Sequence, residues 1–218
     1  MQRYDLPKIG YLLLRAGIWL TIGAEFLGLG VLSYLGTFTR FLADDYCEMI
    51  IVGNGFIVSA VFQNYLLGNY RAANRFSNLF FIGLSESLGR HNVQFLPVLM
   101  ILVWLAGLMW SIYEVKKLAG IRLPAMTDYF LAMTLVFFSA IQAPNRFQTF
   151  FWRSSVATHF APLVFMALLS GFILSCIRSA EGGQPKLWIS LTVFVMSFLA
   201  GGFSISPAQD WYNDACAE

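Results

Sequence analysis

Residues 93–113, VQFLPVLMILVWLAGLMWSIY, decide the fold class of this chain, because they form a long apolar run without a charged side chain. A helix needs about 20 largely apolar residues to cross the hydrocarbon core of a bilayer. Similar stretches occur at residues 11–34, 124–143, 157–177 and 187–203. The sequence therefore predicts an all-α, polytopic transmembrane helix bundle with about five spans, and residues 1–218 are expected to form a single transmembrane domain.

The composition of the chain supports the same class. The sequence is 58% hydrophobic and only 12% charged, whereas roughly a quarter of the residues of a typical soluble domain are charged. A water-soluble globule would have too few charged groups to cover its surface, so the lipid bilayer is the first expected partner. The basic residues are scattered rather than gathered in a stripe, which excludes nucleic acid as a partner.

Two further apolar stretches, residues 49–67 and 76–88, are harder to place. The first is long enough to span, but Gly55, Ser59 and Gln63 recur every four residues and give one helix face a polar stripe. Such a helix fits the membrane interface or a protein-lined cavity better than lipid. Both stretches are predicted to be interfacial helices in a long first outer loop.

The distribution of basic residues predicts the orientation of the chain. With five spans, all four lysines fall on one side, and cytoplasmic loops are the ones enriched in Lys and Arg; they are Lys8, Lys116, Lys117 and Lys186. A sixth span at residues 49–67 would place Lys8 on the side opposite to the other three. The amino terminus is therefore expected in the cytoplasm.

Arginines, in contrast, concentrate in the predicted outer loops, at Arg40, Arg71, Arg75, Arg90, Arg146 and Arg153. This placement opposes the usual charge bias unless these residues bind an anion. A lipid headgroup and a phosphate-bearing substrate are the two candidates. Arg71 and Arg75 are four residues apart, so on a helix they would share one face and could hold phosphate oxygens. Snorkelling to the headgroup level is the alternative.

The adjacent carboxylates Asp44 and Asp45, in the run Ala43-Asp44-Asp45-Tyr46-Cys47, are the strongest local signal. Mutual repulsion at a membrane surface tends to raise the pKa of one member of such a pair. One carboxylate could then act as a general base, or both could bind a divalent cation such as Mg²⁺ or Mn²⁺ through oxygen ligands. A structural alternative is that one of them caps a helix that starts near Glu48.

A third run, Phe150-Phe151-Trp152-Arg153-Ser154-Ser155, leads into the fourth span through Thr158-His159-Phe160-Ala161-Pro162. By itself this run is typical of an aromatic belt with an interfacial arginine.

Within the first span, Glu25 is an intramembrane carboxylate, which is a functional candidate by default. Arg15 is ten residues away, about 15 Å along a helix, so Glu25 is expected to pair with a neighbouring helix or to face an outer cavity.

Taken in order, these runs resemble the motifs of the GT-C superfamily, which comprises polytopic glycosyltransferases that use polyprenyl-phosphate sugars. The chain looks most like the amino-terminal part of a bacterial branch with Asp-Asp-Tyr-Cys, Gly-Arg-Phe and Tyr-Trp-x-x-Gly motifs. The corresponding runs here are Asp44-Asp45-Tyr46-Cys47, Asn74-Arg75-Phe76 and Phe151-Trp152-Arg153-Ser154-Ser155. The resemblance covers most of the chain. It is based on the order of these short motifs along the chain and on their shared predicted side of the membrane.

The resemblance implies inverting transfer of a sugar from a polyprenyl-phosphate donor on the outer face of a bacterial plasma membrane. It makes Asp44 the catalytic base, with Asp45 assisting or holding a metal ion. Donor and phosphate binding would fall to Arg71, Arg75, Trp152, Arg153 and His159. The family's usual length, which exceeds that of this chain, implies one of three alternatives: an amino-terminal module of a longer protein, a fragment, or a stand-alone degenerate subunit. The rival hypothesis is a non-catalytic membrane subunit that binds lipid phosphate or packs against a partner protein.

Overall fold

The computed structural model describes residues 8–42, 45–46, 49, 57–59, 61, 76–89, 91–180 and 187–203, and in these ranges every regular element is a helix. The prediction of an all-α fold is therefore confirmed. Four helices in the described ranges are long and apolar enough to cross a membrane; they run over Gly10–Gly36, Asn92–Leu118, Ala125–Gln142 and Arg153–Ser179. The protein is thus an integral membrane protein with a helical bundle.

These four helices correspond to four of the five predicted spans. They are α1 (Lys8–Gly36), α5 (Asn92–Leu118), α6 (Ala125–Gln142) and the continuous run of α8 (Arg153–Ser155), η2 (Val156–Phe160) and α9 (Ala161–Ala180). The fifth prediction corresponds to α10 (Leu187–Gly201), which has only 15 residues. At 1.5 Å per residue α10 is about 22 Å long, shorter than the hydrocarbon core of about 30 Å.

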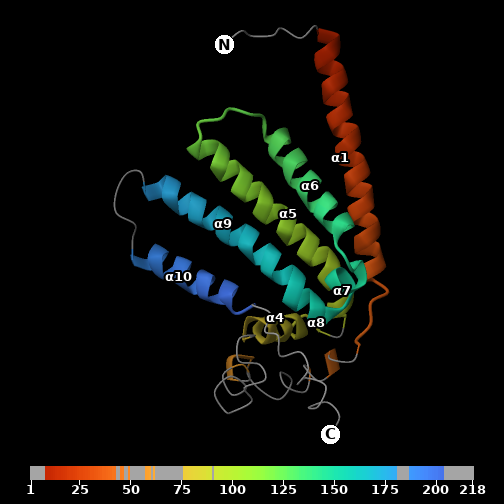
Figure 1. Ribbon diagram of the computed structural model, residues 1–218, viewed down its shortest axis with the longest axis vertical. Coiled ribbons are helices and arrows are strands. Elements are labelled where there is room, and N and C mark those ends of the chain that lie inside the picture. Colours follow the sequence, from red (N-terminus) through yellow and green to blue (C-terminus); the bar gives the residue numbers. More distant parts are fainter. Residues whose placement is uncertain are drawn as a thin grey trace.

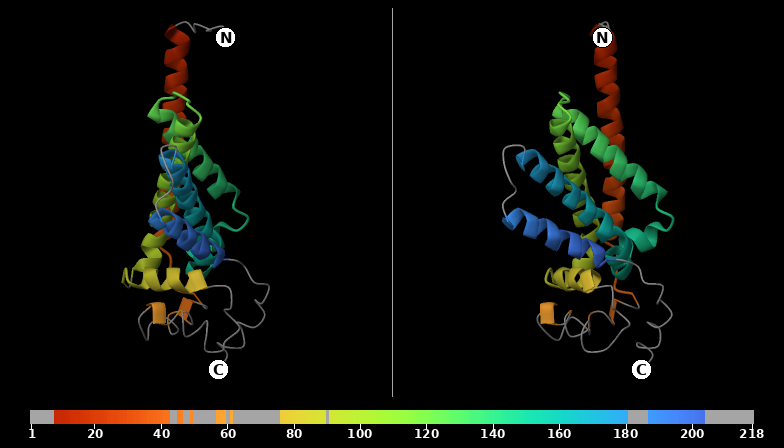
Figure 2. Two further views of the ribbon diagram at one scale, coloured as in Figure 1. Left: turned by 90° about the vertical axis from the view of Figure 1, so that its left-hand side faces the viewer. Right: turned by 60° about the vertical axis from the view of Figure 1, so that its left-hand side comes forward.

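The helices alternate in direction, as Figures 1 and 2 show. The carboxyl end of α1 and the amino end of α5 lie at the same end of the bundle. That residues 49–67 do not span alone stays a prediction. Of that stretch the structure describes residues 49, 57–59 and 61, so its predicted interfacial helix lies outside the described residues.

The second predicted interfacial stretch is a helix, α4 (Phe76–Glu86), which lies across this end of the bundle (Figure 1). Two contacts join it to α10. The Phe76 and Phe198 rings stack with centroids 4.7 Å apart, and the Ser77 hydroxyl donates to the Leu199 carbonyl at 2.6 Å. On its other face, Leu79 and Ile82 pack against Ala157 of η2. α4 therefore connects the short helix α10 to the region around α8 and η2.

Close packing of α5 against α9 forms the centre of the bundle. A Cβ atom on Gly107 of α5 would lie 3.1 Å from the Leu168 amide nitrogen, so the two backbones approach each other at this glycine. One turn further along α5, the Ser111 hydroxyl donates to the Ala167 carbonyl at 2.8 Å. Small residues and interhelical hydrogen bonds are the usual means by which helices associate in lipid, where no hydrophobic effect drives them together.

Two carboxylates inside the helical spans are paired with neighbouring helices. Glu25 of α1 is buried and accepts hydrogen bonds from the Thr134 hydroxyl of α6 at 3.0 and 3.3 Å. The prediction that Glu25 pairs with a neighbouring helix is thus confirmed. Glu114 of α5, also buried, accepts from Arg178 of α9 at 2.6 and 3.1 Å in a two-pronged ion pair. No spacing in the sequence predicts this pair, which adds a charge-assisted contact between α5 and α9.

Candidate functional site

The third motif lies where the chain enters its last long membrane helix. α7 (Arg146–Phe151) ends at Trp152, whose backbone is extended, and α8 begins at the next residue. The following turn, η2, is a π-helix in which the Ala161 amide bonds to the Val156 carbonyl. Pro162 has no N–H to continue the regular ladder, which gives a physical reason for the wider turn just before it. π-turns within α-helices are frequent at functional sites.

Asp45 of the acidic motif lies at the amino end of α8. Its Oδ1 atom accepts hydrogen bonds from the Ser154 amide at 3.0 Å and from the Ser154 hydroxyl at 2.8 Å. Its Oδ2 atom accepts from the Leu42 amide at 2.9 Å. Asp45 is fully buried, and its charge lies where the first amides of a helix point outward and the helix dipole favours an anion. Asp45 therefore caps α8 from a distant part of the chain. The predicted cap of a helix starting near Glu48 involves residues outside the described ranges and stays a prediction.

Arg153 is the second component of this cluster. Its guanidinium donates to the Asp45 carbonyl at 2.7 Å and to the Glu86 carboxylate at the end of α4. The Nε atom also lies 3.6 Å from Oδ1 of Asp45, and the guanidinium carbon lies 5.0 Å from the centre of the Phe41 ring. One buried guanidinium thus joins two carboxylates, and with them the acidic motif, α4 and α8. We name Phe41, Asp45, Glu86, Arg153 and Ser154 the arginine cluster.

The arginine cluster brings together two of the three predicted motifs, although Asp45 and Arg153 are 108 residues apart in the chain. The guanidinium of Arg153 has no exposed surface, so in this arrangement its contacts are with protein groups. The remaining predicted carboxylate and the predicted arginine fork, Asp44, Arg71 and Arg75, lie outside the described residues.

Trp152 and His159, the other predicted donor-binding residues, flank the arginine cluster in sequence. Trp152 is half-buried, and its indole N–H has no hydrogen-bond partner among the residues that the structure describes. His159 is exposed and lines a cavity of about 500 Å³ with polar groups that include Gln142, Asn145 and Gln148. Trp104 of α5 and Phe160 of η2 contribute the apolar part of its wall. This cavity is large enough for a monosaccharide-sized group.

The predicted divalent cation at Asp44 and Asp45 stays a prediction. Both carboxylate oxygens of Asp45 accept hydrogen bonds from backbone or hydroxyl donors, as described above. Within the described ranges, no group of three His, Cys, Asp or Glu side chains is arranged to hold a metal ion. Asp45 alone is therefore a poor metal ligand, and a metal site would depend on Asp44.

Glu86 is the member of the arginine cluster that sequence analysis missed. The available signal was its position as the single acidic residue of the apolar stretch 76–88. A carboxylate in an otherwise apolar helix at a membrane surface needs a partner, because burial of an unpaired charge is costly. The motif around Arg153 offered a cation on the same predicted side, but the sequence does not indicate which of six outer arginines would reach it.

Comparison of the chain with protein-family models, with curated proteins and with solved structures finds no match. The resemblance to GT-C glycosyltransferases therefore rests on the motifs alone. The class that the fold defines is a helical integral membrane protein, with a buried ionic cluster at one end of its long helices. Any assignment of activity has to be argued from that cluster and its surroundings.

Proposed function

We propose that this protein is a GT-C-like glycosyltransferase that transfers a sugar from a polyprenyl-phosphate donor at the outer face of the membrane. The observation that carries the proposal is the arginine cluster, in which Asp45 of the acidic motif is bonded to Arg153 and Ser154 of the aromatic motif. Short motifs of this kind have a common function only if the fold places them at one site. The direct contacts between these two motifs, at the same end of the long helices, support such a site.

The proposed reaction is a single displacement at the anomeric carbon. The oxygen of an acceptor hydroxyl forms the new glycosidic bond, while the bond from the anomeric carbon to the phosphate oxygen breaks. The polyprenyl phosphate leaves with the electron pair, and the hydroxyl proton passes to a carboxylate base. The configuration at the anomeric carbon is inverted. Fixed positive charge near the departing phosphate favours this step, since negative charge develops there.

Within this proposal, Asp44 is the base, and Asp45 and Arg153 hold the acidic motif in place. The reason is that the Asp45 carboxylate and the Arg153 guanidinium are buried and bonded to protein groups. We assign the departing phosphate to Arg71 and Arg75, and the sugar to the cavity lined by His159. The exposed ring of His159 and the amides of Gln142 and Gln148 can donate to and accept from sugar hydroxyls.

A second candidate function is that of a non-catalytic membrane subunit. The arginine cluster itself favours this candidate, because a buried guanidinium that neutralises one buried carboxylate, Asp45, and one partly buried carboxylate, Glu86, is also what a purely structural ion cluster contains. In that case the outer arginines would bind lipid phosphate, or the chain would pack against a partner membrane protein.

The experiment is a transfer assay with the full chain in proteoliposomes, supplied with polyprenyl-phosphate sugars and a panel of hydroxyl acceptors. Wild-type protein is expected to release polyprenyl phosphate, and Asp44→Asn to abolish release. Asp5→Asn, a matched carboxyl-to-amide change at the amino terminus, serves as control and should be fully active. Unchanged transfer by Asp44→Asn would refute the assigned base. Absence of transfer by folded wild type across the donors would favour the subunit.

A further inference from the structure

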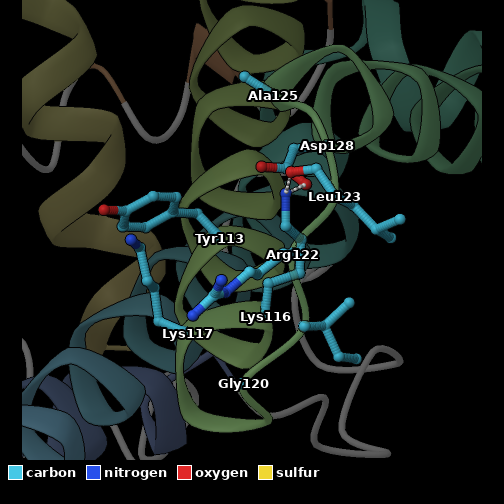
Figure 3. Close-up of a pocket in the computed structure, with 9 residues that line it drawn as sticks. Tyr113, Lys116, Lys117, Gly120, Arg122, Leu123, Ala125 and Asp128 are labelled. Carbon is cyan, nitrogen blue, oxygen red and sulfur yellow. Dashed lines mark hydrogen bonds and ion pairs between the residues drawn. The ribbon is translucent and has the colours of Figure 1, made fainter.

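The turn between α5 and α6 contains a pocket at the opposite end of the long helices from the arginine cluster. It has a volume of about 370 Å³ and is lined by Tyr113, Lys116, Lys117, Gly120, Ile121, Arg122, Leu123, Ala125 and Asp128 (Figure 3). Three of these residues are cations, and one is an anion. We call this the basic pocket. Nothing in the proposed glycosyltransferase reaction uses it.

The turn is fixed by its own hydrogen bonds. The Ile121 amide donates to the Lys116 carbonyl at 2.9 Å, and the Gly120 amide to the Lys117 carbonyl at 3.2 Å. This pattern is a Schellman motif, in which the residue after the helix cap adopts a left-handed conformation. Gly120 meets that need with a φ of 66°, a region that glycine enters without steric cost. The cations on either side of Gly120 are thereby held around one pocket.

One of the three cations is already neutralised. The Lys116 ammonium donates to the Asp128 carboxylate at 2.6 Å and to the Leu123 carbonyl at 2.9 Å. Figure 3 shows this contact as the dashed lines between Lys116 and Asp128. Lys117 and Arg122 are exposed and form no ion pair with any residue in the described ranges. Among the residues that the structure describes, Lys117 and Arg122 thus give the pocket two positive charges without an acidic partner.

The aromatic and apolar side chains that line the basic pocket suit the parts of a phospholipid that lie next to its phosphate. The Lys117 ammonium lies 5.4 Å from the centre of the Tyr113 ring, so this ring can support the cation while its hydroxyl is available to donate. Ile121 and Leu123 are about half exposed, at 49% and 48%. Apolar side chains next to free cations, at the end of membrane-spanning helices, suit a ligand that has both a phosphate and an acyl chain.

We propose that the basic pocket binds the phosphate of an anionic phospholipid, with Lys117 and Arg122 as its ligands and Ile121 and Leu123 in contact with the acyl chains. Arg122 offers a planar fork of donors for phosphate oxygens, and Lys117 offers a point charge. Basic pockets between transmembrane helices are known sites for anionic headgroups. A free phosphate ion shares the same chemistry, but it would gain nothing from the exposed leucine and isoleucine.

The test uses the full chain in nanodiscs that contain phosphatidylglycerol and phosphatidylcholine in equal amounts. Native mass spectrometry then measures the phosphatidylglycerol that the extracted protein retains. The double variant Lys117→Gln/Arg122→Gln is expected to bind this lipid at least about 10-fold more weakly, since it removes both proposed phosphate ligands of the basic pocket. Lys8→Gln/Arg15→Gln removes the same charge from α1, near the same end of the bundle, and should retain the lipid.

Two further measurements decide the remaining outcomes. The thermal unfolding of both double variants should match that of the wild type, because neither change touches the Lys116–Asp128 ion pair. Equal lipid retention by the pocket variant and the wild type would overturn the site. Competition with inorganic phosphate distinguishes the two candidate ligands, an anionic phospholipid and a free phosphate ion. Displacement of the lipid by phosphate at comparable concentration would overturn the lipid as occupant in favour of a free anion.

Discussion

The Asp45 carboxylate accepts hydrogen bonds from both the backbone amide and the side-chain hydroxyl of Ser154, although the two residues are 109 positions apart. The contact ties the segment after the first membrane helix to the start of the last long one. Arg153 reinforces it through the Asp45 carbonyl. A cluster of this kind fixes the geometry of the chain at one end of the bundle, whether or not that end is catalytic.

Replacement of Arg153 should destabilise the protein strongly. Arg153→Met keeps most of the side-chain volume but leaves two carboxylates, Asp45 and Glu86, without the cation that they share. Removal of one partner from a buried ion pair typically costs about 3–5 kcal/mol. Thermal unfolding in detergent should show a large drop in midpoint. Arg146→Met, an exposed arginine on α7, is the matched control and should unfold like the wild type; equal midpoints for both variants would contradict the importance of the cluster.

The contact between Asp45 and Ser154 should appear as a coupling between two mutations. Ser154→Ala removes the hydroxyl donor and keeps the amide, so alone it should cost about 1 kcal/mol. Residues in direct contact show interaction energies of about 0.5–3 kcal/mol in double-mutant cycles. The free energy of unfolding of the Ser154→Ala/Asp45→Ala double variant should therefore differ from the sum of the single changes. Ser87→Ala, on an exposed serine whose hydroxyl donates to the Leu84 carbonyl within its own turn, should be additive with Asp45→Ala.

The helical fold followed from sequence because lipid imposes a simple requirement. Apolar runs such as residues 93–113 must satisfy their backbone groups internally, so their length and composition predict helices directly. The stretch at residues 187–203 does form a helix, α10, but the helix ends at Gly201 and has 15 residues. Periodicity and length predict elements, but they do not predict where each helix ends.

Pairing of the polar groups was much less predictable. Asp45 and Arg153 could be selected from the sequence by their chemistry and predicted side of the membrane. Their partners Glu86 and Ser154 could not, because these contacts depend on how α4 and α8 pack. The same limit applies to the ion pair of Glu114 with Arg178, 64 residues apart, which no spacing rule indicates. Such contacts arise from tertiary packing, which a single sequence does not encode in any local pattern.

The glycine at the contact of α5 with α9, Gly107, leaves little room for a side chain. Gly107→Ala would place a Cβ atom 3.1 Å from the Leu168 amide nitrogen, and this backbone cannot move aside as a flexible side chain could. We expect a loss of about 1–3 kcal/mol, as for other overpacked interiors. Gly23→Ala on α1 is the matched control, because no atom lies within 4 Å of its Cβ position. That change should be neutral or stabilising by up to about 1 kcal/mol, since alanine favours helix.

Removal of the charge of the buried Glu25 side chain should cost less stability than removal of its hydrogen-bond donor, Thr134. Glu25→Gln keeps a carbonyl oxygen that can accept from Thr134, and it removes a charge from the membrane interior. It should unfold at the same temperature as the wild type or higher. Thr134→Val removes the donor and should cost about 1–3 kcal/mol, because a buried acceptor loses its hydrogen bond. Thr21→Val, on an exposed threonine of α1, is the control for the valine change. A larger loss for Glu25→Gln than for Thr134→Val would indicate that the charge itself is needed.

The orientation of the bundle can be tested by the labelling of two introduced cysteines. Ala119 lies in the turn after α5, beside the lysines that predict the cytoplasmic side, whereas Ser87 follows α4 at the opposite end (Figure 1). Both positions are exposed. In a background with the native cysteines changed to serine, a membrane-impermeant maleimide added to intact cells should label Ser87→Cys. Ala119→Cys should react only after permeabilisation, because cytoplasmic loops are the ones enriched in lysine. The reverse pattern would place the arginine cluster in the cytoplasm and would remove the outer-face donor from the proposed reaction.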